Sequence, residues 1–102
     1  MKKIIILIPV YNDWNSLEKL ILEINKNTKD LKKVQIDFII INDASKINHS
    51  KLKIPKEINM FKILNMKQNK GHARCNAFGI RHIIKNEQFD NIILMDGDGE
   101  DR

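Results

Sequence analysis

The stretch Ile4-Ile5-Ile6-Leu7-Ile8, close to the start of the chain, decides the fold class. It is a continuous apolar run, rich in β-branched side chains, and it is followed by Pro9. Runs of this kind are typical of strands that are buried on both faces, as in parallel sheets. The run is short and lacks a small-residue cleavage site, which argues against a signal peptide. We therefore predict a first strand here, with Pro9 ending its pairing.

Working outward from this strand, three more apolar runs predict strands at 34–41, 58–64 and 91–95. A first helix is predicted from Asn15, with Asn15 itself, Asn12 or Asp13 as its N-cap. It should end within the polar residues 25–30. Its apolar face follows helical spacing at Leu17, Leu20, Ile21 and Ile24.

A second helix is predicted from about His72 to Lys85, and a short one around residues 48–52. Gly79 inside the second helix indicates close packing. The residues expected to line its buried face are Ala73, Ala77, Ile80 and Ile84.

The alternation of strands and helices predicts an α/β fold, a mostly parallel Rossmann-like sheet with helices on both faces. At 102 residues the chain is one domain at most. Cys75 is the only cysteine, which favours a reducing, cytoplasmic compartment and a packing role for this residue. The net charge is +5, but the lysines are scattered without an arginine stripe, so we expect no nucleic-acid partner.

Polar clusters follow three of the predicted strands, at residues 11–13, 42–45 and 96–101. Because the carboxyl ends of parallel strands share one edge of the sheet, all three clusters should open onto that edge. The last cluster is Asp96-Gly97-Asp98-Gly99-Glu100-Asp101. Crowded carboxylates repel one another unless a cation lies between them, and carboxylate oxygens suit Mg²⁺ or Mn²⁺. The alternative is a solvated acidic loop.

Several nucleotide and metal motifs are excluded. The turn after the first strand has no glycine, so neither a dinucleotide fingerprint nor a P-loop is present. A calcium loop starting at Asp96 would need glycine where Asp101 stands. A site for a nucleotide sugar fits better, because a divalent ion held by two carboxylates would neutralise the diphosphate leaving group.

Four stretches together resemble the N-terminal half of family 2 glycosyltransferases, which have the glycosyltransferase-A fold. They are similar above all to the dolichol-phosphate mannose synthase-like branch. These stretches, in chain order, are Ile8-Pro9-Val10-Tyr11-Asn12-Asp13, Ile40-Ile41-Asn42-Asp43-Ala44-Ser45, Asn69-Lys70-Gly71-His72-Ala73-Arg74 continuing to Gly79-Ile80, and Met95-Asp96-Gly97-Asp98. Two departures are Asn42, in place of the first acidic residue of the usual pair, and Ala44, in place of glycine.

The resemblance implies a metal held by Asp96, Asp98 and Glu100. It also implies a nucleotide bound by Pro9, Val10, Tyr11, Asp13, Asp43, Arg74, Asp96 and Gly97, with Asp43 holding the base. The donor would be a UDP- or GDP-sugar, and an inverting displacement would pass the sugar to a polyprenyl phosphate or a glycan.

By the same resemblance, residues 1–102 form a single partial domain that lacks the acceptor half. The catalytic base is then expected beyond Arg102, and this chain alone is expected to be inactive. The longer protein would lie in the cytoplasm, with peripheral association at the cytoplasmic face of a membrane. A non-catalytic nucleotide-binding module and an inactive truncated product remain alternatives. His72 and His82 have no evident partner in the sequence and are interpreted as structural or exposed.

Overall fold

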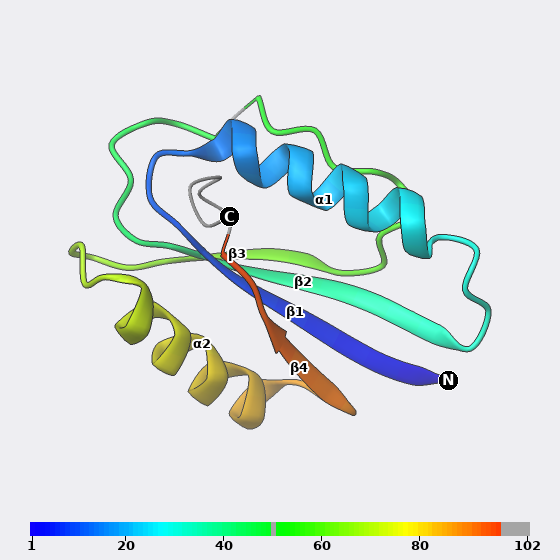
Figure 1. The fold of residues 1–102 in the computed structure, drawn as a ribbon. Helices are drawn as coiled ribbons and strands as arrows, with labels where there is room; N and C mark the ends of the chain where they lie inside the picture. Colours follow the sequence, from blue (N-terminus) through cyan, green and yellow to red (C-terminus); the bar gives the residue numbers. More distant parts are fainter. Residues whose placement is uncertain (50, 97–102) are drawn as a thin grey trace.

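The computed structural model describes residues 1–49 and 51–96. Along the chain lie β1 (Lys2–Val10), α1 (Trp14–Thr28), β2 (Val34–Asn42), β3 (Phe61–Asn65), α2 (His72–Asn86) and β4 (Asn91–Leu94). The four strands form one parallel sheet in the order β3-β2-β1-β4. Figure 1 shows α1 on one face of this sheet and α2 on the other. The prediction of an α/β fold with helices on both faces is therefore confirmed.

Strand β1 lies at the centre of the sheet and continues to Val10, so the prediction that Pro9 ends its pairing is wrong. Pro9 lies opposite Ile41 of β2. The carbonyls of Lys3 and Leu7 accept hydrogen bonds on the β4 side, and every second residue of a strand points its backbone groups to the same side. The N–H that proline lacks would thus point toward β4, beyond its last register pair at Leu7. The ladder to β2 is left intact.

Helix α1 covers the sheet face formed by Ile6, Ile8, Phe38 and Ile40. The predicted apolar face is confirmed: Leu17 and Ile21 are fully buried, and Leu20 and Ile24 pack at the margin. Asp13 is the N-cap, accepting a 3.3 Å hydrogen bond from the backbone N–H of Ser16. Trp14 packs in the same cluster, and its Nε1 donates to the carbonyl of Ile47.

Helix α2 is rotated relative to the prediction. Its buried residues are Cys75, Gly79 and Ile83, whereas Ala73 and Ala77 are exposed and Ile84 is 64% exposed. A Cβ on Gly79 would lie 2.5 Å from Cδ1 of Leu7. The small residues allow the helix to approach β1 closely, which confirms the predicted packing role of Gly79. The buried face of α2 is therefore determined by the small size of its residues as well as by their hydropathy.

The third strand and the short helix predicted around residues 48–52 also differ from the prediction. The third strand begins at Phe61, three residues later than expected. No helix is present in the described residues 48, 49, 51 and 52. That segment instead runs beside α1, where the ring of His49 lies 4.6 Å from that of Trp14.

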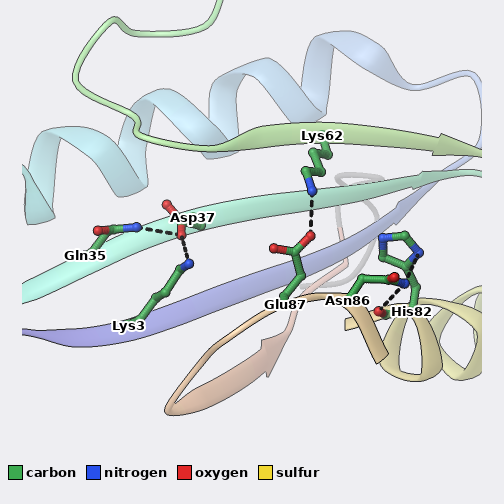
Figure 2. A network of polar contacts seen from close by, with 7 residues as sticks. All are labelled: Lys3, Gln35, Asp37, Lys62, His82, Asn86 and Glu87. Carbon is green, nitrogen blue, oxygen red and sulfur yellow. Dashed lines mark hydrogen bonds and ion pairs between the residues drawn. The ribbon is translucent and has the colours of Figure 1, made fainter. Parts of the chain in front are cut away.

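One buried polar group lies within the sheet, away from the strand ends. Asp37 of β2 is 0% exposed and accepts a 2.8 Å hydrogen bond from Gln35, with the Lys3 ammonium 3.8 Å away (Figure 2). Among the described residues, no group donates to its Oδ1. Figure 2 also shows Lys62 pointing at Glu87, just past the end of α2. The contact between Lys62 and Glu87 joins β3 to the C-terminal end of α2, whereas those of Asp37 lie within the sheet.

Within residues 1–49 and 51–96, neither helix has the length and hydropathy needed to cross a membrane.

Candidate functional site

The carboxyl ends of β1, β2 and β4 lie at one edge of the sheet because the three strands are parallel and adjacent. The segments that follow them begin at Tyr11, Asp43 and Met95. The sheet extends in opposite directions from β1, toward β2 and β3 on one side and toward β4 on the other. Such a reversal opens a crevice where ligands bind in α/β sheets.

The ends of β1 and β2 are held together by Asn12. Its Oδ1 accepts hydrogen bonds from the backbone N–H groups of Lys46 and Ile47, at 2.7 and 3.1 Å. Its own N–H donates to Oγ of Ser45 at 2.8 Å. Asn12 has a φ of 65° and Ala44 one of 58°, both in the left-handed region. Asparagine tolerates this region better than alanine does. Glycine, which the resembled family has at position 44, would adopt this φ without strain.

Asp43 joins the end of β2 to the start of α2. The residue is 1% exposed. Its Oδ1 accepts a 2.7 Å hydrogen bond from the N–H of Lys70, and its Oδ2 a 2.9 Å bond from the N–H of Gly71. Its backbone carbonyl accepts a further bond from the side chain of Asn69. The carboxylate thus fixes the backbone that leads into α2.

The thiol of Cys75 lies against the same carboxylate. Burial, followed by the hydrogen bond and the charge of Asp43, raises the pKa of Cys75 from 9.0 to about 12. The thiol is therefore a neutral donor at physiological pH and not a nucleophile. The predicted packing role of Cys75 agrees with its full burial.

Asp96 is the last described residue, and it lies beside the first residue of α2. Its Oδ1 is 3.5 Å from Nδ1 of His72, and the two side chains are 37% and 35% exposed. The interpretation of His72 as structural or exposed did not include this contact. The sequence carried no signal for this contact, because it depends on α2 starting next to the end of β4. His82 instead lies near Asn86, one helical turn further along α2.

The remaining predicted site residues differ in accessibility. Pro9 and Val10 are buried, and the carbonyl of Val10 accepts the N–H of Asp43. Tyr11 is 38% exposed, and Arg74 is exposed on the first turns of α2. The predicted ligands Gly97, Asp98 and Glu100 lie outside the described residues.

Asn76 of α2 was not predicted as a site residue. Its Oδ1 is buried and has no hydrogen-bond partner among the described residues. It lines a cavity of about 450 Å³ at the end of β4, together with Leu20, Leu94, Met95 and Asp96. The asparagine lies one helical turn after His72, a spacing that could have identified it.

The described part of the chain holds no cluster of three or more His, Cys, Asp or Glu side chains that could bind a metal ion. It does hold two donors side by side, the carboxylate of Asp96 and the imidazole of His72. Oxygen and imidazole nitrogen donors are both compatible with a divalent first-row ion. This part of the donor set therefore fits a metal.

A parallel α/β sheet with polar loops at three neighbouring strand ends is the arrangement in which open α/β domains bind their ligands. The sequence model of glycosyl transferase family 2 matches residues 5–102. The chain therefore belongs to glycosyl transferase family 2.

A curated relative is the "Uncharacterized protein MJ0544" of Methanocaldococcus jannaschii, which is 34% identical to this chain over 98 residues. The matched region covers 92% of this chain and 39% of the relative. The chain thus spans about two fifths of the length of that protein.

Proposed function

We propose that residues 1–102 form the donor-binding part of a metal-dependent glycosyltransferase, which binds a UDP- or GDP-sugar at the carboxyl edge of the sheet. The observation that carries the proposal is the meeting of three strand ends at that edge. There Asn12 joins β1 to β2, Asp43 joins β2 to α2, and His72 of α2 lies beside Asp96. Family membership supports the transfer of a sugar as the reaction class.

The nucleoside lies, in this proposal, against the turn from Pro9 to Asp13 and the loop held by Asp43. Tyr11 supplies an exposed ring for the base. The prediction that Asp43 itself contacts the base is untested. Its burial and its bonds to Lys70 and Gly71 favour a role through the loop that it positions.

The diphosphate lies between the start of α2 and Asp96. The N-terminus of a helix carries partial positive charge, and the exposed Arg74 adds a full one. Asp96 would hold Mg²⁺ or Mn²⁺ together with Asp98 and Glu100, and Gly97 would let the backbone approach the phosphates. Such an ion neutralises charge on the leaving diphosphate.

In the longer protein, we propose inverting transfer of the sugar to a polyprenyl phosphate or a glycan, as in the dolichol-phosphate mannose synthase-like branch. A polyprenyl acceptor would place that protein at the cytoplasmic face of a membrane. The catalytic base would lie beyond Arg102, so this chain alone would bind donor without transferring sugar. Sugar transfer by the isolated chain would contradict that last point.

Calorimetry of UDP and GDP, each with and without Mn²⁺, tests donor binding. The native chain is compared with Asp96→Asn and Asp98→Ala, and with Asp30→Asn, an exposed position after α1, as the matched control. We expect binding that needs Mn²⁺ and is lost in the first two variants only. Metal-independent binding, or equal loss in Asp30→Asn, would contradict the proposed site. Tight nucleotide binding by a full-length protein that transfers no sugar would favour the alternative, a non-catalytic nucleotide-binding module.

A further inference from the structure

The contact between His72 and Asp96 is longer than a hydrogen bond and has the distance of an ion pair. Nδ1 and Oδ1 are 3.5 Å apart, whereas N–H···O hydrogen bonds in proteins span about 2.7–3.2 Å. Two ligands bound to one ion at about 2.1 Å lie about 3.0 Å apart at a right angle and about 3.4 Å apart at a tetrahedral angle. The observed 3.5 Å lies about 0.5 Å beyond the right-angle separation, so a small movement of either side chain would bring both atoms to one metal ion.

Both side chains are also placed for access from solvent. Each is about one third exposed, at 35% for His72 and 37% for Asp96. They come from different elements, His72 from the first position of α2 and Asp96 from the segment after β4. Asp43 fixes the backbone N–H groups of Lys70 and Gly71, the two residues before His72. The backbone that leads into His72 is thus tied to the end of β2.

We propose that His72 supplies a nitrogen ligand to the same divalent ion that Asp96 binds. This inference rests on the proposed function and adds a donor outside the acidic stretch. A nitrogen ligand has a consequence for selectivity, because Mg²⁺ prefers an all-oxygen shell whereas first-row transition ions accept imidazole. The site therefore selects Mn²⁺ over Mg²⁺ more strongly than carboxylates alone would.

Pulsed electron paramagnetic resonance of Mn²⁺ bound to the 102-residue chain tests the proposal, since it detects a nitrogen nucleus bonded to the ion. The native chain should show nitrogen coupling. Incorporation of ¹⁵N into histidine alone should change that coupling, a result that needs no variant to fold.

His72→Gln should abolish the coupling and weaken Mn²⁺ binding by about tenfold or more. Removing a residue that only hydrogen-bonds to a metal ligand already costs about that much, and a direct ligand should cost no less. The preference for Mn²⁺ over Mg²⁺ should fall with it, because glutamine offers an oxygen donor. His82→Gln, on the same helix beside Asn86, is the matched control and should keep both properties.

Bound Mn²⁺ without histidine coupling, or coupling that survives His72→Gln, overturns the role of His72 and leaves the proposed function standing. Failure of the native chain to bind Mn²⁺ overturns both. Coupling lost equally in His82→Gln and His72→Gln also contradicts the assignment, because the nitrogen would then not belong to His72 alone.

Discussion

The carboxylate of Asp43 accepts a 2.9 Å hydrogen bond from the backbone N–H of Gly71, which lies 28 residues further along the chain. Gly71 is the N-cap of α2 and has a φ of 87°, and no side chain caps that helix locally. Asp43 instead binds the backbone N–H groups of Lys70 and Gly71, the two residues that lead into the helix. The start of α2 is therefore held by the sheet and not by its own sequence.

Asp43→Asn should destabilise the chain by about 2–3 kcal/mol, because a neutral amide replaces a buried carboxylate that binds two backbone donors and a thiol. Urea unfolding measures the free energy. Asp30→Asn, at an exposed site, should change it by less than about 0.5 kcal/mol. If the two variants were equally stable, the carboxylate would have no structural role.

Ala44→Gly should stabilise the chain by about 0.5–1 kcal/mol. Ala44 has a φ of 58°, where an L side chain costs about 1–2 kcal/mol. Glycine removes this cost, but it loses more backbone entropy on folding than alanine, which cancels part of the gain. The matched control is Ala77→Gly on the exposed face of α2, which should destabilise by about 1 kcal/mol. Thermal unfolding of both variants checks the signs, and a lower midpoint for Ala44→Gly would refute the argument.

Asp37→Val should leave stability unchanged or raise it by about 1–3 kcal/mol. The carboxylate is fully buried, and in the described structure its Oδ1 lacks a donor. A β-branched apolar side chain suits the strand, and the Lys3 side chain, which is 31% exposed, can keep its charge in solvent once the carboxylate is gone. Urea unfolding gives the comparison, with Asp37→Asn as the variant that keeps a polar group buried. A large loss in Asp37→Val alone would indicate that the contact with Lys3 is strongly stabilising.

Stability should fall above pH 9 because of Cys75. The unfolded thiol ionises near 9.0, whereas the pKa in the folded chain is about 12, so the folded state holds the proton over this range. Unfolding then releases a proton, and the free energy of unfolding falls as pH rises from 9 to 12. At pH 10 the loss relative to pH 8 should be about 1.4 kcal/mol.

Urea titrations of native chain and Cys75→Ala at pH 8 and pH 10 measure this loss. The two proteins differ only at position 75, so the difference between the two losses isolates the thiol. Identical pH dependence in the two proteins would show that Cys75 does not stay protonated on folding.

The two central strands, β1 and β2, followed from continuous apolar runs rich in β-branched residues, which favour strands buried on both faces. The end of β1 did not, since the effect of Pro9 depends on which neighbour its missing N–H would face. The orientation of α2 was also missed. Cys75 and Gly79 are buried for their small size against Leu7, a property that hydropathy does not register.

The candidate site was predictable as three polar strand ends but not as a set of contacts. Asp43 was identified from its place after β2, yet its bonds to Lys70 and Gly71 depend on the distance between two loops. His72 was missed for the same reason, because its neighbour Asp96 lies on another element. A sequence pattern identifies residues on one segment, whereas pairs across segments require the fold.

The carboxylate of Asp43 accepts hydrogen bonds from backbone N–H groups, and the side chains of positions 70 and 72 take no part in them. The loop can therefore keep its shape while those two side chains are exchanged. A small library at Lys70 and His72 would vary charge and donor type on an unchanged backbone. This loop is accordingly a favourable place to redesign the charge and donor type that the proposed donor-binding edge presents.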